Sequence, residues 1–401
     1  IYNDWRALLA KVPTVVWSAA AAEIPGADDG AYQPGEYKYV DKTAVLHDML
    51  LDVKHFMFVT APRRMGKSTM LSMLAQLAAG NWAAFPPGAP RWTSDASDVQ
   101  VIRLNFSRVI WPGDDATAAE SARALRDYII EQAGSQHRID ISSVHGGHPL
   151  SEWINTHVQN RKRVVVLVDE YDQAVVDMAL NDTGNNRGSK RAEQFAQEVL
   201  KPFFAALKDS GATKVIVAGV SNFALNTVGS GANHFRHAFH VNHEFARAIG
   251  YTPDELRQTY GEAVLKRYER ELKGDVTASL PAALNYVKSY GNGWCLESTA
   301  TIELLSPFVV NAWLRDRDRC ISITEIWAET GTPHALVALL RTHAALLLGR
   351  RRVRWSALCA ELPFDAYFSA SNVDQLGFQF GYLSIEVGSH EEEEEEEEDA
   401  V

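Results

Sequence analysis

Four short runs of Val, Ile, Leu and Phe, separated by helix-length segments, constrain the fold most strongly. They lie at residues 55–60, 101–106, 164–168 and 214–220. Nearly continuous apolar runs of this length are typical of parallel strands buried on both faces. The segments between them, at residues 68–79, 119–132 and 189–208, have helical patterns, the last interrupted near Pro202. The sequence therefore predicts an α/β fold, a mostly parallel sheet flanked by helices.

The first run leads into a turn that is typical of phosphate binding. Residues 61–68 read APRRMGKS, with Ala61 at the first motif position, and an amphipathic helix follows. Gly66 permits a tight turn, so backbone N–H groups and the helix N-terminus face a phosphate. Lys67 is predicted to reach the β and γ phosphates and Ser68 to bind Mg²⁺. The predicted nucleotide-binding residues are Pro62, Arg63, Arg64, Met65, Gly66, Lys67, Ser68 and Thr69.

The third run ends in two acids. Asp169 and Glu170 follow residues 163–168, RVVVLV, and burial of that strand forces both acids out at its carboxyl end, beside the phosphate-binding turn. Asp169 is predicted to hold Mg²⁺ together with Ser68. Glu170 is predicted to act as the general base toward the attacking water, with Lys67 as a further catalytic residue. This pairing predicts a P-loop NTPase.

Two further groups near the predicted site have competing interpretations. Ser221 and Asn222 follow the fourth run, where they either sense the γ phosphate, with Ser221 as a catalytic residue, or simply form a turn. Arg63 and Arg64 either neutralise charge on the transferred phosphoryl group or point elsewhere on the surface. The sequence leaves both alternatives open.

Charge and hydropathy bear on location and partners. The net charge is −12, but residues 391–399 are all acidic, which leaves about −3 for the rest. The net charge therefore does not support nucleic-acid binding, although the sequence leaves open a local basic patch.

The chain has no apolar run of about 18 residues, so we expect no membrane span. Three Cys residues far apart fit neither a disulfide framework nor a zinc site. We expect an intracellular protein, cytoplasmic or nuclear, although the missing initial Met leaves a removed leader open.

Composition divides the chain into five predicted segments. The strand signal fades after about residue 243, where helical patterns dominate and Pro253 opens a long helix. The predicted segments are an N-terminal segment at 1–36, a P-loop core at 37–243, a helical domain at 244–345, a C-terminal extension at 346–388 and a disordered acidic tail at 389–401.

These motifs together resemble the AAA-ATPase-like family, predicted P-loop ATPases often joined to a C-terminal PD-(D/E)XK nuclease-like domain. The resemblance is carried by YVDKT at 39–43, PRRMGKS at 62–68, VLVDEYD at 166–172, AGVSNF at 218–223, GYTPDEL at 250–256, YGNGW at 290–294, SPF at 306–308, Trp327 with ETGTP at 329–333, and FGYL at 380–383. It implies a P-loop ATPase core, ATP as the nucleotide and a helical lid of winged-helix-like type. Because no Asp followed by Glu-x-Lys occurs after residue 385, we expect no nuclease activity.

Three functional hypotheses remain. The first is Mg²⁺-dependent ATP hydrolysis that drives a conformational switch acting on a protein partner. The sequence leaves unknown the identity of that partner and the oligomeric state of this chain. The second is a nucleotide-gated binding module with negligible turnover. The third is a remnant of an ATPase-nuclease acting on nucleic acid. His145 and His148 lack the partners of a metal site, and Trp294, Trp313 and Trp327 are expected in the core.

Overall fold

The structure is a computed structural model that describes most of the chain between residues 40 and 315. The described residues are 40–137, 148–180, 187–222, 236–272, 278–290, 293–315, 353, 358 and 372–380, with gaps at 83–84, 86–87, 93–97 and 114–115. The predicted segments at 1–36 and 389–401, Trp327 and most of the predicted extension lie outside them.

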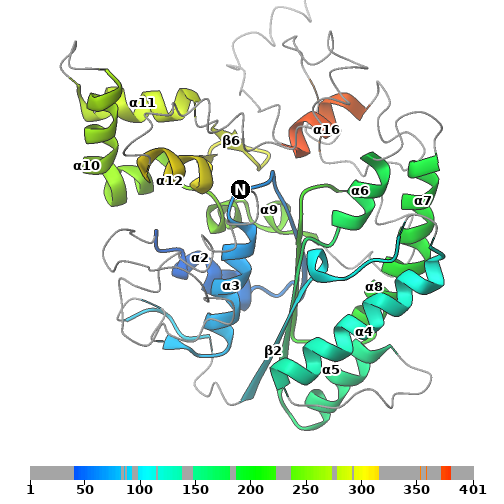
Figure 1. Cartoon of the computed structure of the whole chain (residues 1–401). Coiled ribbons are helices and arrows are strands. Elements are labelled where there is room, and N and C mark those ends of the chain that lie inside the picture. Colours follow the sequence, from blue (N-terminus) through cyan, green and yellow to red (C-terminus); the bar gives the residue numbers. More distant parts are fainter. Residues whose placement is uncertain are drawn as a thin grey trace, which may run out of the picture.

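Five parallel strands form the central sheet in the order β2-β3-β4-β1-β5. Figure 1 shows this sheet with helices on either side. The strands are β1 (Phe56–Thr60), β2 (Val99–Asn105), β3 (Arg163–Asp169), β4 (Lys214–Gly219) and β5 (Arg236–His237). The four predicted strands are confirmed within about two residues, and β5 is an addition. Because the strands are parallel, their carboxyl ends meet at one edge, where the turn after β1 lies between the ends of β4 and β5.

Helices cover both faces of the sheet. They are α2 (Thr43–Leu51), α3 (Lys67–Ala78), α4 (Ala118–His137), α5 (Pro149–Gln159), α6 (Gln173–Leu180), α7 (Arg187–Phe195), α8 (Lys201–Lys208) and α9 (Ala238–Val241), with the short turns η5 (Phe106–Arg108), η6 (Ala196–Leu200) and η7 (His243–Ala248). The predicted interruption near Pro202 is confirmed, because the π-helical turn η6 separates α7 from α8 there.

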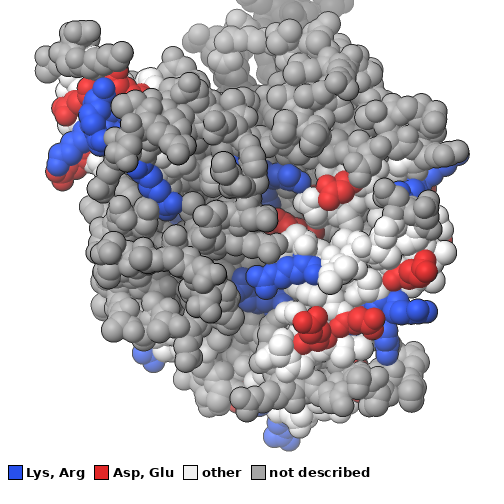
Figure 2. Space-filling model, viewed as in Figure 1, with Lys and Arg blue, Asp and Glu red and all other residues white. Residues whose placement is uncertain are grey.

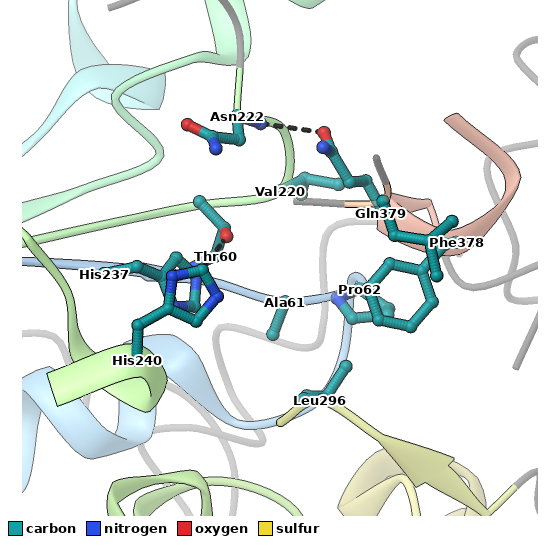
Figure 3. Close-up of a pocket in the computed structure, with 11 residues that line it drawn as sticks. Thr60, Ala61, Pro62, Val220, Asn222, His237, His240, Leu296, Phe378 and Gln379 are labelled. Atoms are coloured by element: carbon teal, nitrogen blue, oxygen red, sulfur yellow. Dashed lines mark hydrogen bonds between the residues drawn. The ribbon is translucent and has the colours of Figure 1, made fainter. Parts of the chain in front are cut away.

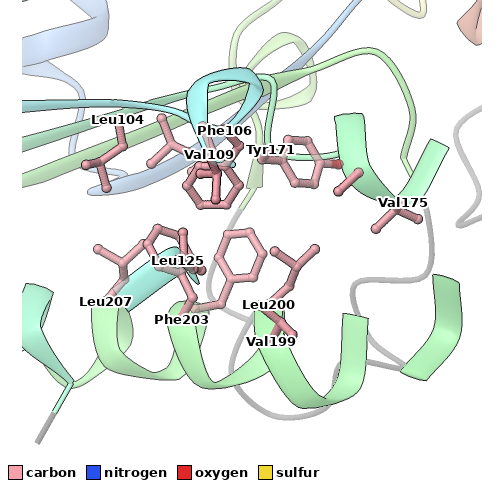
Figure 4. Packing of buried hydrophobic residues seen from close by; sticks show 14 of the residues in the cluster. Leu104, Phe106, Val109, Leu125, Tyr171, Val175, Val199, Leu200, Phe203 and Leu207 are labelled. Atoms are coloured by element: carbon pink, nitrogen blue, oxygen red, sulfur yellow. The ribbon is translucent and has the colours of Figure 1, made fainter. Parts of the chain in front are cut away.

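Two hydrophobic clusters lie on opposite faces of the sheet. One packs β3 residues Val164, Val166 and Val168 against α4, α5, α7 and α8. Figure 4 shows part of this cluster around Phe106 and Phe203. The other packs the alternate β3 residues, Val165 and Leu167, against α2, α3 and α9. Successive strand residues point to opposite faces, so burial on both sides requires the uninterrupted apolar runs seen in the sequence.

Three helices after residue 250 have a core of their own. They are α10 (Pro253–Glu271), α11 (Leu280–Tyr290) and α12 (Pro307–Arg315), and we call them the helical unit. Leu256, Val264, Val287 and Val310 are among the apolar side chains of this core, with the predicted core residue Trp313 fully buried. The antiparallel pair β6 (Trp294–Cys295) and β7 (Glu303–Leu304) joins α11 to α12. A winged-helix character stays a prediction, since residues 316–352 are not described.

One late helix returns to the sheet. The helix α16 (Val373–Gln379) packs Val373, Leu376 and the following Phe380 into the cluster that also contains β3 and β4. The chain therefore comes back to the core after the helical unit.

Candidate active site

The turn after β1 has the backbone shape of a phosphate cradle. Gly66 adopts a left-handed conformation with φ of 90° and caps α3, where the Met70 N–H donates to the Gly66 carbonyl at 2.9 Å. Arg64 is also left-handed, with φ of 72°. The N-terminus of α3 thus presents N–H groups and the positive end of its dipole at the sheet edge.

Lys67 is buried inside this turn. Its side chain is 7% exposed, and Nζ donates to the carbonyls of Ala61 at 2.6 Å and Pro62 at 2.8 Å. Among the described residues, no carboxylate lies within ion-pair distance of Nζ. Burial lowers the pKa of Lys67 to about 8, although nearby acids, Asp172 first, act in the opposite direction. A cation held by carbonyls alone is suited to receive an anion.

The predicted metal ligands lie together. Ser68 lies close enough to the Asp169 carboxylate to lower the pKa of that carboxyl, so the turn after β1 lies beside the end of β3. Burial raises the pKa of Asp169 to about 6. Two hard oxygens fit Mg²⁺, which is held by few protein ligands and keeps several waters. No group of three or more His, Cys, Asp or Glu that could hold a metal occurs in the described part of the chain.

Glu170 follows in a strained backbone conformation. Its φ is 53°, unusual for a residue with a side chain, and its N–H donates to Asp169 Oδ1 at 3.1 Å. The side chain is only partly buried, in contrast to Asp169. Strained backbone is concentrated at functional sites, so this geometry is compatible with the predicted role of Glu170 as a base.

Ser221 is engaged by an acid of the neighbouring strand connection. It is fully buried, and Asp172 Oδ2 accepts from the Ser221 N–H at 2.6 Å, the Ser221 hydroxyl at 2.8 Å and the Val220 N–H at 2.9 Å. The Tyr171 hydroxyl donates to the Ser221 carbonyl at 2.7 Å. Ser221 thus fastens the end of β4 to the segment after β3. Its catalytic role stays a prediction.

The two loop arginines point to different neighbours. Arg63 Nη2 donates to Gln173 Oε1 at 3.1 Å, on the side of the β3 acids. The Arg64 guanidinium lies 4.3 Å from the centre of the Phe308 ring, on the side of the helical unit. Of the two loop arginines, Arg63 therefore contacts the segment that follows the β3 acids.

Contacts from beyond the sheet hold the P-loop. The Gly250 N–H donates to the Met65 carbonyl at 2.7 Å, and the Ser306 hydroxyl donates to the Arg64 carbonyl at 3.1 Å. With Phe308 under Arg64, we call Gly250, Ser306 and Phe308 the P-loop clamp. Sequence reasoning assigned them no contact with the loop, although they lie in segments that carry the family resemblance.

Other predicted features have ordinary structural roles. His148 Nδ1 accepts from the Leu150 N–H at 3.3 Å and caps α5, and burial lowers the pKa of His148 to about 4. His145 lies outside the described residues. On the face in Figure 2, described basic and acidic side chains lie side by side. None of the described helices combines the length and apolar character needed to cross a membrane.

Comparison with known proteins identifies the family. Residues 31–229 match the model of the AAA-ATPase-like family, described as predicted AAA-ATPase. The chain belongs to this family. The family match supports nucleotide binding, with ATP as the nucleotide.

The family match is accompanied by a similarity to one curated protein. The chain is 29% identical over 360 residues to "Uncharacterized protein in vnfD 5'region" from Azotobacter chroococcum mcd 1. The alignment covers 87% of this chain and 61% of that relative, so the chain spans less than two thirds of its length. No solved structure matches the chain.

Proposed function

We propose that this chain binds ATP with Mg²⁺ at the P-loop and hydrolyses it. The observation that supports this most is buried Lys67 in the turn after β1, with Ser68 beside the Asp169 carboxylate at the end of β3. When bound, Mg²⁺ would supply positive charge to the phosphates. Lys67 would exchange its carbonyl partners for phosphate oxygens, and Glu170 would orient the attacking water and accept its proton.

The test is phosphate release from ATP with Mg²⁺. Lys67→Ala should lower ATP affinity about 100-fold, because the cation that faces the phosphates is lost. Glu170→Gln should keep ATP affinity within a few-fold and lower turnover about 100-fold or more, as expected for the loss of a general base. Glu262→Gln is a matched control, since it removes the charge of an exposed acid on α10. Wild-type turnover in Glu170→Gln would exclude that residue as the base.

We further propose that the nucleotide moves the helical unit and so signals to a protein partner. The support is the P-loop clamp, because two P-loop carbonyls accept hydrogen bonds from Gly250 and Ser306. A phosphate that reshapes the loop would change these contacts, and the helical unit has its own core with which to move as a body.

The same clamp favours a second candidate, a nucleotide-gated binding module with negligible turnover. Such a module needs the cradle and the clamp but no base. Wild-type protein that binds Mg-ATP and releases no phosphate, or that is purified with intact ATP in equal amount, would favour this candidate over hydrolysis. A partner that restores turnover would return the assignment to an ATPase.

A further inference from the structure

The chain just before α2 is attached to the helical unit. Lys42 Nζ donates to both carboxylate oxygens of Glu255, at 2.7 Å each, across 213 positions of the chain. Lys42 is 7% exposed, so water and salt screen this ion pair only weakly. Two residues earlier, Val40 belongs to the core of the helical unit, together with Leu256. The ion pair and the apolar contact therefore join the chain before α2 to α10.

Lys42 is also attached to the nucleotide-binding core. The helix α2 begins at the next residue, Thr43, whose N–H donates to Asp41 Oδ1 at 2.9 Å. Leu46 and Leu50 of α2 are buried in the cluster that contains α3, the helix that follows the P-loop. Lys42 therefore connects the helical unit to a helix that packs against the P-loop helix.

Glu255 has a second partner at the start of α10. Its Oε2 accepts from the Thr252 N–H at 2.8 Å, and the Thr252 hydroxyl accepts from the Glu255 N–H at 3.2 Å, which together form a capping box. One carboxylate thus holds both Lys42 and Thr252. The first turn of α10 is therefore fixed relative to the cation that precedes α2.

Thr252 lies next to the P-loop clamp. The residue before it, Tyr251, pairs with Leu305 through two backbone hydrogen bonds of 2.9 and 2.8 Å. Gly250 and Ser306, the two hydrogen-bond donors of the clamp, flank this pair in the chain. An unbroken series of contacts therefore leads from the ion pair to the P-loop carbonyls.

An apolar contact also joins this region to the P-loop, but it would not hold the clamp in place by itself. Leu296, which follows β6, lines a small cavity with Ala61 and Pro62 (Figure 3). Such contacts are non-directional, whereas a hydrogen bond weakens steeply when its angle changes. The donors of the clamp therefore need a support that fixes their direction.

We propose that Lys42 is a positioning residue for the nucleotide, because its ion pair with Glu255 fixes the P-loop clamp. The inference rests on the proposed function, since the effect on ATP requires ATP at the P-loop. Without the cation, the start of α10 loses its attachment to α2, and Gly250 and Ser306 lose their fixed direction toward the loop carbonyls. The helical unit keeps its own core, so it stays folded while its hold on the P-loop weakens.

The first measurement needs no nucleotide. Amide hydrogen exchange of Gly250, whose N–H donates to the Met65 carbonyl, reports the clamp directly in the full chain. The variants are Lys42→Met, which removes the cation, and Glu255→Gln, which removes the charge but keeps an acceptor for the capping box. Lys288→Met is the matched control, because it breaks a Lys–Glu pair of 2.6 Å that joins α11 to β7 and does not involve α2.

We expect Lys42→Met and Glu255→Gln each to speed Gly250 exchange about tenfold, while Val264 inside α10 exchanges at the wild-type rate. Lys288→Met should leave Gly250 exchange within about twofold of wild type. Unchanged Gly250 exchange in Lys42→Met would overturn the inference. Equal acceleration at Gly250 and Val264 would overturn it as well, because that result indicates a general loss of stability.

The second measurement is ATP affinity with Mg²⁺, with Glu170→Gln in every variant so that ATP survives the titration. Lys42→Met should lower the affinity about tenfold, whereas Lys288→Met should leave it unchanged. Lys42→Met combined with Ser306→Ala should lose no more affinity than Lys42→Met alone, because both act through the clamp. An additive loss would show that Lys42 acts by another route, contrary to the inference.

The two measurements separate the role of Lys42 from the proposed function. Wild-type protein that binds no ATP would contradict the proposed function, and wild-type protein that binds ATP without releasing phosphate would contradict hydrolysis alone. In either case, Gly250 exchange still decides whether Lys42 holds the clamp.

Discussion

Two buried cations, one in the P-loop and one in the helical unit, have opposite surroundings. Within the described part of the chain, Lys67 Nζ donates only to the carbonyls of Ala61 and Pro62. Arg267 is 1% exposed, donates from Nε to the Trp313 carbonyl at 3.0 Å and lies 3.4 Å from Glu271 Oε1 through Nη2. Its guanidinium also lies 5.4 Å from the centre of the Trp313 ring.

The difference separates a binding group from a structural group. The charge of Arg267 is compensated by a carboxylate of the same helix, so its desolvation is offset within the folded chain. Burial of Lys67 lowers its pKa, and carbonyls compensate its charge less well than a phosphate would. Phosphate oxygens would offset the remaining desolvation. The comparison therefore predicts that Arg267 contributes to stability and Lys67 to ligand affinity.

The largest expected effect tests this contrast in the unfolding free energy. Arg267→Leu should lower it by about 3–5 kcal/mol, because Glu271 then stays buried without its cation. Lys67→Met should change it by less than about 1 kcal/mol, because only carbonyl contacts are lost and a desolvated charge is removed. Chemical denaturation of both variants measures the difference. Equal destabilisation by the two substitutions would show that the contrast is wrong.

Gly250→Ala sharpens the comparison where the two regions meet. Gly250 has φ of 64°, and a Cβ there would lie 2.9 Å from Leu304 Cβ. We expect a loss of about 2–3 kcal/mol in unfolding free energy from strain and overpacking. ATP affinity should fall as well, because the bond to the Met65 carbonyl shifts. Gly113→Ala is the control, since a Cβ there has nothing within 4 Å; a similar loss of affinity in that variant would contradict the explanation.

Ser306→Ala tests the clamp with a matched helix cap. Ser306 accepts from the Val309 N–H at 3.4 Å at the start of α12 and also donates to the Arg64 carbonyl. Ser279 accepts from the Ala282 N–H at 3.3 Å at the start of α11. Both substitutions to Ala should cost about 1 kcal/mol of stability. Only Ser306→Ala should also weaken ATP binding, by about threefold to tenfold. Equal ATP affinities in the two variants would show that the P-loop clamp has no part in the proposed mechanism.

The parts of this molecule that sequence predicts are those that local pattern determines. The strands β1, β3 and β4 are buried on both faces, so their apolar runs identify them directly. The sequence also predicted burial on both faces for β2, but β2 lies at the edge of the sheet and buries Ile102 and Leu104 while Arg103 between them is exposed. Gly66, Lys67, Ser68 and Asp169 follow those strands immediately, and the parallel order brings them to one edge. The strand β5 has only two residues, which is too short for a repeating pattern of apolar side chains to identify it in the sequence.

What sequence misses depends on pairing between distant residues. Gly250 and Ser306 meet the P-loop across roughly 185 and 242 positions, and no local pattern contains that contact. The sequence leaves open whether Ser221 senses the γ phosphate or forms a turn, and it does not reveal that Asp172 accepts a hydrogen bond from the Ser221 hydroxyl. From the sequence alone, two polar residues that hydrogen-bond to each other cannot be distinguished from two polar residues that bind a ligand.

The neutral, buried side chain of His237 extends the comparison from buried cations to a buried base. His237 on β5 bonds the Thr60 hydroxyl through Nε2 at 2.6 Å, and burial, then nearby His240, lowers the pKa of His237 to about 3. An unfolded His titrates near 6.5. Between these values the unfolded chain binds more protons, so the contribution of His237 is complete above pH 6.5 and is lost as pH falls toward 3.

His237→Gln should make stability less sensitive to acid, because Gln can still reach Thr60 but does not titrate. We expect wild type to lose up to about 2 kcal/mol more unfolding free energy than the variant between pH 7 and pH 5. Urea denaturation at the two pH values measures this difference. If wild type and variant lose the same amount, His237 is not held neutral, and the contrast drawn from Lys67 and Arg267 applies only to the two cations.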